Sequence, residues 1–288
     1  MRGILAFALT ISLGLATAEA EPIAIVAAEN FYGDVAEQVG GSAVKVTSIL
    51  SNPDQDPHLF EASASTARDL AAARIVIYNG ADYDPWMGKL LSASRATGRI
   101  TIEVAKLVGK KAGDNPHLWY DPATMPAVAK AVAAQLAKLD PDHRSDYEKR
   151  RDTFDASLKP IDDKIAALRQ QYAGTAITAT EPVAGYLTEA IHLKMRNPRF
   201  QLAIMNNTEP SASEIAAFQK DLKTRAVKVL LYNSQTSEEL TEKMRTIAKD
   251  SGVPVVGVTE TEPAGNKYQD WMLSELAALE TGLSGKQP

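Results

Sequence analysis

The fold is decided by residues 140–172, which have the sequence DPDHRSDYEKRRDTFDASLKPIDDKIAALRQQY. Charged residues, alanine and leucine recur there at helical spacing, and no part of the stretch alternates as a strand would. Roughly thirty helical residues at about 1.5 Å each extend on the order of 45 Å, which is longer than one domain. Pro160 predicts a kink in this helix or, as the alternative, two ordinary helices separated at the proline. We expect a helical spine that joins two domains.

Strand and helix patterns alternate on both sides of this spine. Before it, strands are expected at 23–28, 44–50, 74–78 and 101–104, and helices at 31–39, 61–72 and 84–91. After it, strands are expected at 176–180, 200–205, 227–232 and 255–258, and helices at 183–191, 211–223, 237–251 and 268–283. This order predicts parallel sheets covered by helices. We therefore expect an α/β protein with an N-terminal lobe at 21–124, a helical linker at 125–173 and a C-terminal lobe at 174–288.

The beginning of the chain predicts export. Arg2 precedes an apolar run at 4–15 that is short for a membrane span, and Ala18-Glu19-Ala20 fits the small-x-small cleavage rule. We expect a signal peptide at 1–20, a mature chain that starts at Glu21, and a periplasmic location. No cysteine follows the apolar run, so we expect no lipid anchor there. A buried N-terminal helix is the alternative.

Composition excludes several classes of site and partner. The chain contains no cysteine, which excludes disulfides and thiolate metal sites. The formal net charge is −5, and loss of residues 1–20 leaves it unchanged because that segment holds one basic and one acidic residue. Charges are scattered, with no basic stripe, so we expect no nucleic acid partner.

Two short segments share an unusual sequence motif, Asx-Pro-His-Leu-aromatic. Asp56-Pro57-His58-Leu59-Phe60 and Asn115-Pro116-His117-Leu118-Trp119 hold two of only four histidines in the chain. Proline fixes its own backbone angle and restricts the residue before it, so each histidine is expected on a stiff turn. Metal ligands need such preorganisation. One such motif alone is more often structural, whereas two copies at the carboxyl ends of strands favour a metal site.

Two carboxylates follow predicted strands in the second lobe. Glu181 comes after the strand at 176–180 and precedes Pro182, and Glu260 comes after the strand at 255–258. Together with the two histidines they form a candidate site of nitrogen and oxygen ligands, which suits Mn²⁺ or Fe²⁺ and is acceptable to Zn²⁺. Glu181 could instead be a charge favoured by a helix N-terminus. Glu262 could replace Glu260, or both could be solvated.

These features together resemble the metal-binding solute-binding proteins of ABC importers, the group that carries manganese, iron or zinc. The resemblance covers residues 23–283. The motifs that carry it are Asp56-Pro57-His58, Asn79-Gly80 with Pro85-Trp86, Asn115-Pro116-His117-Leu118-Trp119 with Asp121-Pro122, Glu181 before Gly185-Tyr186-Leu187, Glu209-Pro210-Ser211, and the helix at 268–283. The resemblance implies two lobes joined by one long rigid helix, with the metal in the cleft between them.

The resemblance also implies which residues bind the ion. The first two family ligands match His58 and His117. The third is histidine in many zinc members and glutamate in many manganese or iron members, and here it is Glu181. The fourth is usually aspartate, where this chain offers Glu260. Many zinc members carry a histidine-rich loop between the first two ligands, but residues 107–114 contain no histidine. Glutamate as the third ligand and the absence of a histidine-rich loop both favour manganese or iron.

The expected function is capture of one divalent ion and its delivery to an ABC permease in the inner membrane, by a monomer and without catalysis. We expect the spine to limit lobe closure, and Asp121 or Glu61 to orient the imidazoles. A secreted metallohydrolase would need an open coordination position and a general base, and no His-Glu-x-x-His run is present. A surface adhesin would need an anchor. A binder of an organic solute would show more aromatic and arginine residues near its strand ends.

Overall fold

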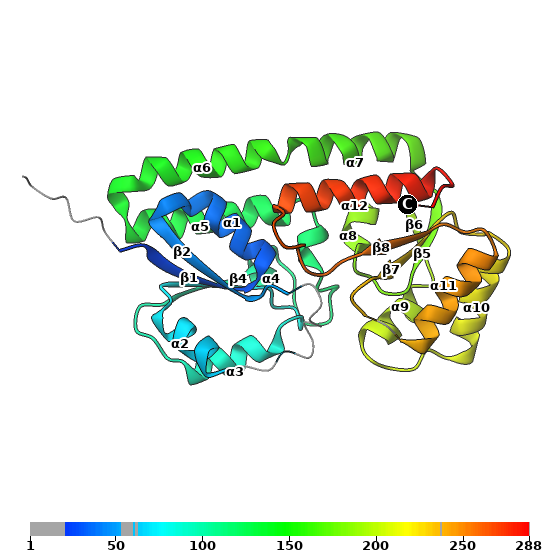
Figure 1. Cartoon of the computed structure of the whole chain (residues 1–288), viewed down its shortest axis with the longest axis horizontal. Coiled ribbons are helices and arrows are strands. Elements are labelled where there is room, and N and C mark those ends of the chain that lie inside the picture. The colour runs from blue at the N-terminus through cyan, green and yellow to red at the C-terminus, as the bar shows by residue number, and fades with distance from the viewer. Residues whose placement is uncertain (1–20, 53–59, 61–62, 237, 288) are drawn as a thin grey trace, which may run out of the picture.

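Two parallel four-stranded sheets lie one after the other along the same side of a helical rod in the computed structural model (Figure 1). The structure describes residues 21–52, 60, 63–236 and 238–287. The predicted signal peptide, His58 and Glu61 therefore lie outside the described residues. The predicted α/β class, with parallel sheets in two lobes, is confirmed.

The first sheet has the strand order β2-β1-β3-β4, and every neighbouring pair is parallel. The elements of this lobe, in chain order, are β1 (Ile23–Glu29), α1 (Asn30–Gly40), β2 (Val44–Leu50), α2 (Ala64–Ala72), β3 (Ile75–Tyr78), α3 (Pro85–Ala93), β4 (Ile100–Glu103), α4 (Val104–Leu107) and a 3₁₀ turn (Leu118–Tyr120).

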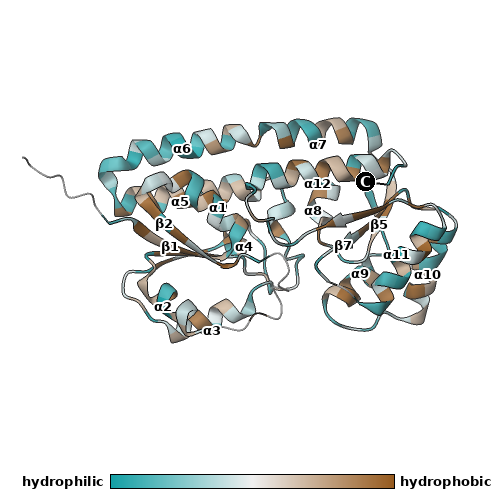
Figure 2. Cartoon of the chain, viewed as in Figure 1, coloured by the Kyte–Doolittle hydropathy of each residue, from teal (hydrophilic) through white to brown (hydrophobic). Residues whose placement is uncertain are grey.

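Side chains of β1 alternate between the two faces of this sheet, as the strand period of two requires. Ile25 and Ala27 join the main core, whereas Val26 and Ala28 join a smaller cluster with residues of α2 and α3. Both sets are buried, so the strand is a continuous apolar run, which is typical of parallel sheets covered on both faces. Figure 2 shows the strands of both sheets as mostly apolar.

The second sheet has the order β6-β5-β7-β8, again parallel throughout. Its lobe contains β5 (Ala176–Ala179), α8 (Gly185–Ala190), β6 (Lys194–Arg196), α9 (Pro198–Met205), α10 (Ala212–Lys223), β7 (Leu230–Asn233), α11 (Glu239–Asp250), β8 (Val255–Val258) and α12 (Tyr268–Leu283). In Figure 1, α9, α10 and α11 lie on one side of the sheet, and α12 lies on the side of the rod.

The strand predicted at 200–205 is wrong. These residues belong to α9, and the edge strand is instead β6, which is only three residues long. Pro198 is in the first turn of α9. Proline is tolerated there because backbone N–H groups in the first turn make no hydrogen bond within the helix. Phe200 and Ile204, four residues apart, are both buried in the core under α10 and α11. A short apolar run fits a strand and a buried helix equally well, and only the proline identifies the helix.

The rod consists of α6 (Arg144–Ser157) and α7 (Lys159–Tyr172), preceded by α5 (Thr124–Leu139). The helical hydrogen bonding is interrupted at Leu158, two residues before Pro160. Leu158 keeps right-handed helical angles, so α7 continues roughly in line with α6 (Figure 1). The predicted spine is thus two helices end to end. α6 packs on α1 and α5, whereas α7 packs on α12, so the rod supports both lobes.

One apolar core runs through both lobes rather than stopping between them. Phe31 of α1 has its ring centroid 4.5 Å from that of Trp119 and 5.9 Å from that of Trp271 in α12. Tyr268 Oη donates a hydrogen bond to the Trp119 carbonyl over 2.8 Å. These aromatic contacts tie the carboxyl end of the first sheet to the second lobe.

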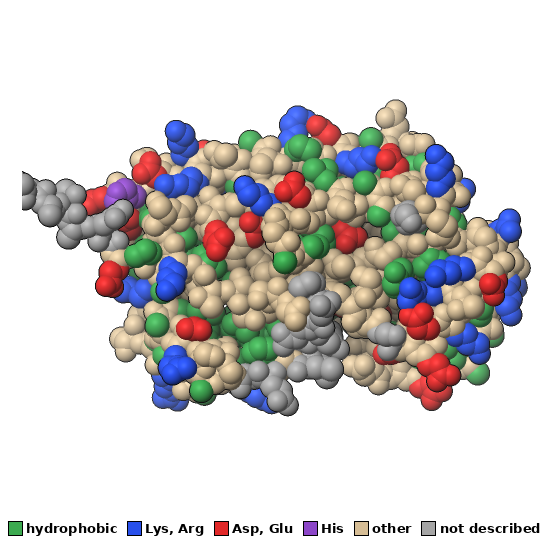
Figure 3. Space-filling view, in the orientation of Figure 1, with side chains coloured by type: hydrophobic (Ala, Val, Ile, Leu, Met, Phe, Trp, Pro, Cys, Tyr) green, Lys and Arg blue, Asp and Glu red, His purple; other side chains and the backbone are tan. Residues whose placement is uncertain are grey.

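The outer surface carries charges of both signs, scattered over the face that Figure 3 shows. None of the helices described in the structure is long and apolar enough to cross a membrane.

Candidate metal-binding site

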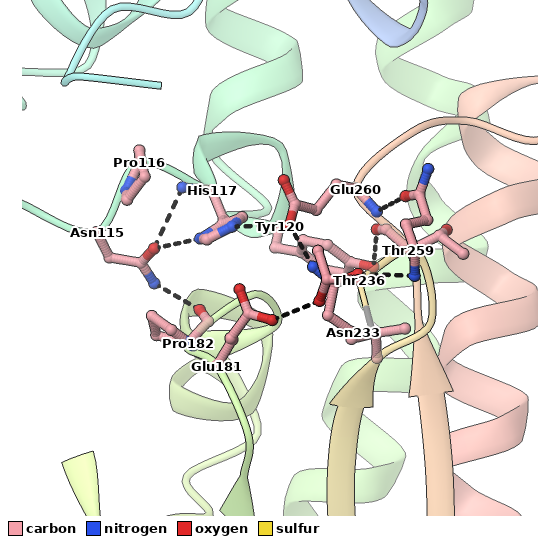
Figure 4. Close-up of polar contacts among 12 residues, drawn as sticks. Asn115, Pro116, His117, Tyr120, Glu181, Pro182, Asn233, Thr236, Thr259 and Glu260 are labelled. Atoms are coloured by element: carbon pink, nitrogen blue, oxygen red, sulfur yellow. Dashed lines mark hydrogen bonds and ion pairs between the residues drawn. The ribbon is translucent and has the colours of Figure 1, made fainter. Parts of the chain in front are cut away.

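Three of the four predicted ligands lie in one neighbourhood between the lobes (Figure 4). His117 directly precedes the 3₁₀ turn of the first lobe, Glu181 follows β5 by two residues, and Glu260 follows β8 by two residues. Their side chains are buried, with 1 %, 8 % and 1 % exposure respectively. The carboxyl ends of parallel strands form one edge of a sheet, and this rule brings the two glutamates together. His58 lies outside the described residues.

Asn115 aims the His117 imidazole. Asn115 Oδ1 lies 2.7 Å from His117 Nδ1 and accepts the His117 backbone N–H over 3.2 Å. Asn115 Nδ2 donates to the Pro182 carbonyl over 2.8 Å, which fixes the amide orientation. The Nδ1 atom therefore carries the proton, and the Nε2 lone pair is available to a metal.

The Asn115 contact also crosses between the lobes. Tyr186 of α8 donates to the Asn115 carbonyl over 2.8 Å. The side chain of Asn115 packs so closely on Gly185 that a Cβ added there would lie 2.7 Å from Asn115 Nδ2. A side chain at this position would push the Asn115 amide aside, so the start of α8 leaves room for the loop that carries His117.

His117 Nε2 points to the second lobe. Its nearest charged atom is Glu260 Oε1, 3.8 Å away, which is too far for a hydrogen bond. This Nε2 is buried, and no group in the described part of the chain hydrogen-bonds it. A buried imidazole nitrogen that no described group satisfies, facing a carboxylate, is the donor arrangement that a divalent ion would complete.

The second lobe orients the Glu260 carboxylate. Asn233 Nδ2 at the end of β7 donates to Glu260 Oε1 over 2.5 Å, and on the other lobe burial and then the Glu260 charge raise the pKa of Tyr83. Gln235 Oε1 accepts the backbone N–H of Glu260 and, over 2.9 Å, that of Thr261. The carboxylate is therefore oriented before any ion arrives.

Glu181 faces this group from β5. Thr236 Oγ1 donates to Glu181 Oε1 over 2.8 Å. Burial, and after it the negative charge of Glu260, raises the pKa of Glu181 from 4.5 to about 7. Two carboxylates buried together disfavour each other's ionised form, and a bound cation reverses this effect.

Glu262, the alternative to Glu260, belongs to a different neighbourhood. Its backbone contacts Asn30, and burial together with the charges of Asp34, Glu37 and Asp270 raises its pKa to about 8. The geometry thus brings Glu260, and not Glu262, to within 3.8 Å of His117 Nε2. Among the described residues, no three His, Asp or Glu side chains are close enough together to form a complete metal site as they stand.

The predicted orienting role of Asp121 is wrong for His117. Asn115 is the residue at Nδ1, and Asp121 Oδ1 instead accepts the Ala123 N–H at the start of α5. The sequence did contain a signal for Asn115, which is an Asx residue two positions before His117. Asx side chains often hydrogen-bond the backbone two residues further along the chain. Asn233, Gln235 and Thr236 were also missed. Asn233 is the last residue of β7, and Gln235 and Thr236 follow it, so their position at the same sheet edge was the signal for them.

The chain as a whole matches a known protein family. Residues 25–282 match the ZnuA family, described as "Zinc-uptake complex component A periplasmic". A putative metal-binding protein of Treponema pallidum is 25 % identical over 259 residues, which cover 82 % of this chain and 78 % of that protein. The iron ABC transporter substrate-binding lipoprotein MtsA of Streptococcus pyogenes is 24 % identical over 294 residues, covering 95 % and 93 %.

A solved structure shows the same fold. The periplasmic zinc-binding protein TroA from Treponema pallidum superposes with a TM-score of 0.75 at 19 % identity, over 92 % of this chain and 99 % of that one. The match to the family extends over nearly the whole chain, and the family consists of solute-binding proteins and not of enzymes. The chain therefore belongs to the ZnuA family of metal-binding solute-binding proteins, which bind divalent metal ions for uptake by ABC importers.

Proposed function

We propose that this protein captures one Mn²⁺ or Fe²⁺ ion in the periplasm and delivers it to an ABC permease of the inner membrane. The proposed ligands are His117, Glu181 and Glu260, with His58 as the fourth from its sequence motif. The observation that supports this most is the buried His117 Nε2, which has no hydrogen-bond partner among the described residues and lies 3.8 Å from Glu260 Oε1. The protein would act as a monomer after removal of residues 1–20.

The donor set supports the choice of metal. Two imidazoles and two carboxylates form a site of intermediate hardness, and carboxylates favour Mn²⁺ and Fe²⁺ more than a site of three imidazoles does. Zinc uptake is the second candidate, because Zn²⁺ generally binds nitrogen and oxygen sites more tightly than Mn²⁺. The named relatives differ in their metals, since one is described with iron and one with zinc.

The structure also supports delivery without wide opening of the lobes. The rod contacts both lobes and the apolar core runs through both, so a large rotation would break buried contacts. We expect release to involve small tilts and local loop movement. X-ray scattering profiles of the metal-free and metal-bound protein should therefore be similar, and a large domain rotation between them would contradict this expectation.

A titration tests the proposed function. Metal-free protein is titrated with Mn²⁺ while the EPR signal of the free ion is followed, and the titration is repeated with Glu181→Ala. The matched control is Glu189→Ala, which removes an exposed carboxylate from α8. We expect stoichiometric binding that Glu181→Ala abolishes and Glu189→Ala preserves. Tight Zn²⁺ binding without Mn²⁺ binding would favour zinc uptake.

A further inference from the structure

Helix α1 presents three polar side chains to a distant part of the chain. Asn30, Asp34 and Gln38 are four residues apart, so they share one face of the helix. All three contact residues 262–269, which connect the Glu260 segment to α12. The partners are more than 200 positions away in sequence and belong to the other lobe.

Asn30 makes a two-point contact with the backbone of Glu262. Asn30 Nδ2 donates to the Glu262 carbonyl over 2.7 Å, and Asn30 Oδ1 accepts the Glu262 N–H over 3.2 Å. A side-chain amide that satisfies both backbone groups of one residue fixes the position and the orientation of that peptide. Asn30 itself directly follows the last residue of β1 and is the first residue of α1.

The other two side chains hold the segment further along. The Tyr268 N–H donates to Asp34 Oδ2 over 3.0 Å, and the amides of Gln38 and Gln269 bond each other over 3.0 and 2.9 Å. Residues 263–267 form a turn between the two attachments, and Gly265 has a positive φ of 82° in it. Both ends of this turn are therefore fastened to the first lobe.

The second lobe holds the same segment just before Asn30 does. Gln235 Oε1 accepts the backbone N–H groups of both Glu260 and Thr261. Glu260 thus lies between an attachment to the second lobe and, two residues later, the attachment to Asn30. Its Oε1 lies 3.8 Å from His117 Nε2.

We propose that Asn30 is a positioning residue for the metal: it fixes the Glu260 segment against the first lobe, so that Glu260 and His117 meet the ion together. This inference rests on the proposed role of Glu260 as a ligand. Asn30 does not itself bind the ion. It couples the end of β1, which belongs to the lobe of His117, to a ligand carried by the other lobe.

The test is a double-mutant cycle of Mn²⁺ affinity on the mature protein, with Asn30→Ala, Glu260→Gln and the combination of both. Residues that orient metal ligands typically change affinity about 10- to 100-fold, so Asn30→Ala should weaken binding at least about 10-fold. In the Glu260→Gln background, Asn30→Ala should weaken Mn²⁺ binding less than about 2-fold. If Asn30 acts through Glu260, the effects of the two substitutions are not additive. Equal losses in both backgrounds would overturn the positioning role.

Two further variants separate positioning from folding. Gln38→Ala removes a contact from the same face of α1, two turns away, and should leave Mn²⁺ affinity within about 2-fold of the wild type. Asn30→Asp keeps the acceptor for the Glu262 N–H but lacks the donor, so it should give an intermediate loss. The EPR spectrum of bound Mn²⁺ should change with both Asn30 variants and stay unchanged with Gln38→Ala. An unchanged spectrum in Asn30→Ala would contradict the inference.

The same experiment distinguishes this inference from the proposed function. If Glu260→Gln binds Mn²⁺ as tightly as the wild type, the ligand assignment fails and the role of Asn30 fails with it. If Glu260→Gln weakens binding but Asn30→Ala does not, the ligand assignment stands and only the positioning role is refuted. Thermal unfolding of each variant, measured without metal, identifies any variant that does not fold.

Discussion

Replacing Glu181 by glutamine should make the metal-free protein more stable while it destroys tight metal binding. In the folded protein, burial and then the Glu260 charge raise the pKa of Glu181 from 4.5 to about 7. Glutamine has nearly the same shape as the protonated carboxyl and never ionises. It can still accept the hydrogen bond that Thr236 donates to Glu181 in the wild type over 2.8 Å.

The magnitude follows from linkage between proton binding and folding. A change of one in pKa is worth about 1.4 kcal/mol, so the increase from 4.5 to about 7 corresponds to about 3 kcal/mol. Because the folded state binds the proton more tightly, the wild type is most stable below pH 4.5 and loses this stability as the pH rises to about 7. Above that pH the loss is constant. The Glu181→Gln variant should not lose this stability, because glutamine does not ionise.

Urea unfolding of both proteins in the presence of a chelator measures this difference. At about pH 4.5 the two free energies of unfolding should be nearly equal, and at about pH 8 the variant should be more stable by up to about 3 kcal/mol. A gap that does not change with pH would refute the reasoning, because only an ionising wild-type side chain makes it pH-dependent. The Glu189→Ala control should show no such gap.

Two further predictions concern the ligands and their supports. Asn115→Ala removes the hydrogen-bond partner of His117 Nδ1 and the hydrogen bond to the Pro182 carbonyl. It should weaken Mn²⁺ binding about 10- to 100-fold in a competition titration. Asn115→Asp should retain more affinity, because it keeps the acceptor at Nδ1. Mn²⁺ affinity should fall as the pH is lowered from about 8 to about 6. The Glu181 carboxyl, whose pKa is about 7 without metal, and the His117 imidazole must both lose their protons to bind the ion. Isothermal titration at several pH values checks this, and an affinity that does not change with pH would contradict these ligands.

The elements that sequence predicted best are those specified by local patterns. The buried apolar run around Ile25 and the helical pattern at 268–283 gave correct strand and helix assignments. The proline beside His117 correctly predicted a turn, and the strand-end rule correctly predicted that Glu181 and Glu260 lie at one edge of the second sheet. These predictions needed only neighbouring residues and general rules about parallel sheets.

The predictions that failed or were missing depend on long-range packing. Phe200 and Ile204 are helical because they pack under α10 and α11, which the local run cannot specify. The contact between Asn30 and Glu262 joins residues 232 positions apart, and Asn115 reaches Pro182 across the lobes. Polar side chains of this kind are common on loops and helix starts, so their partners become visible only once the lobes are placed together.

The central claim is that His117, Glu181 and Glu260 bind one ion together. Anomalous diffraction from crystals soaked in Mn²⁺, recorded on both sides of the manganese absorption edge, tests it most directly. The account predicts a single strong peak within about 2.0–2.3 Å of His117 Nε2 and of a carboxylate oxygen of each glutamate. A peak beside Asp34, Glu37 and Glu262, with none at His117, would contradict the account.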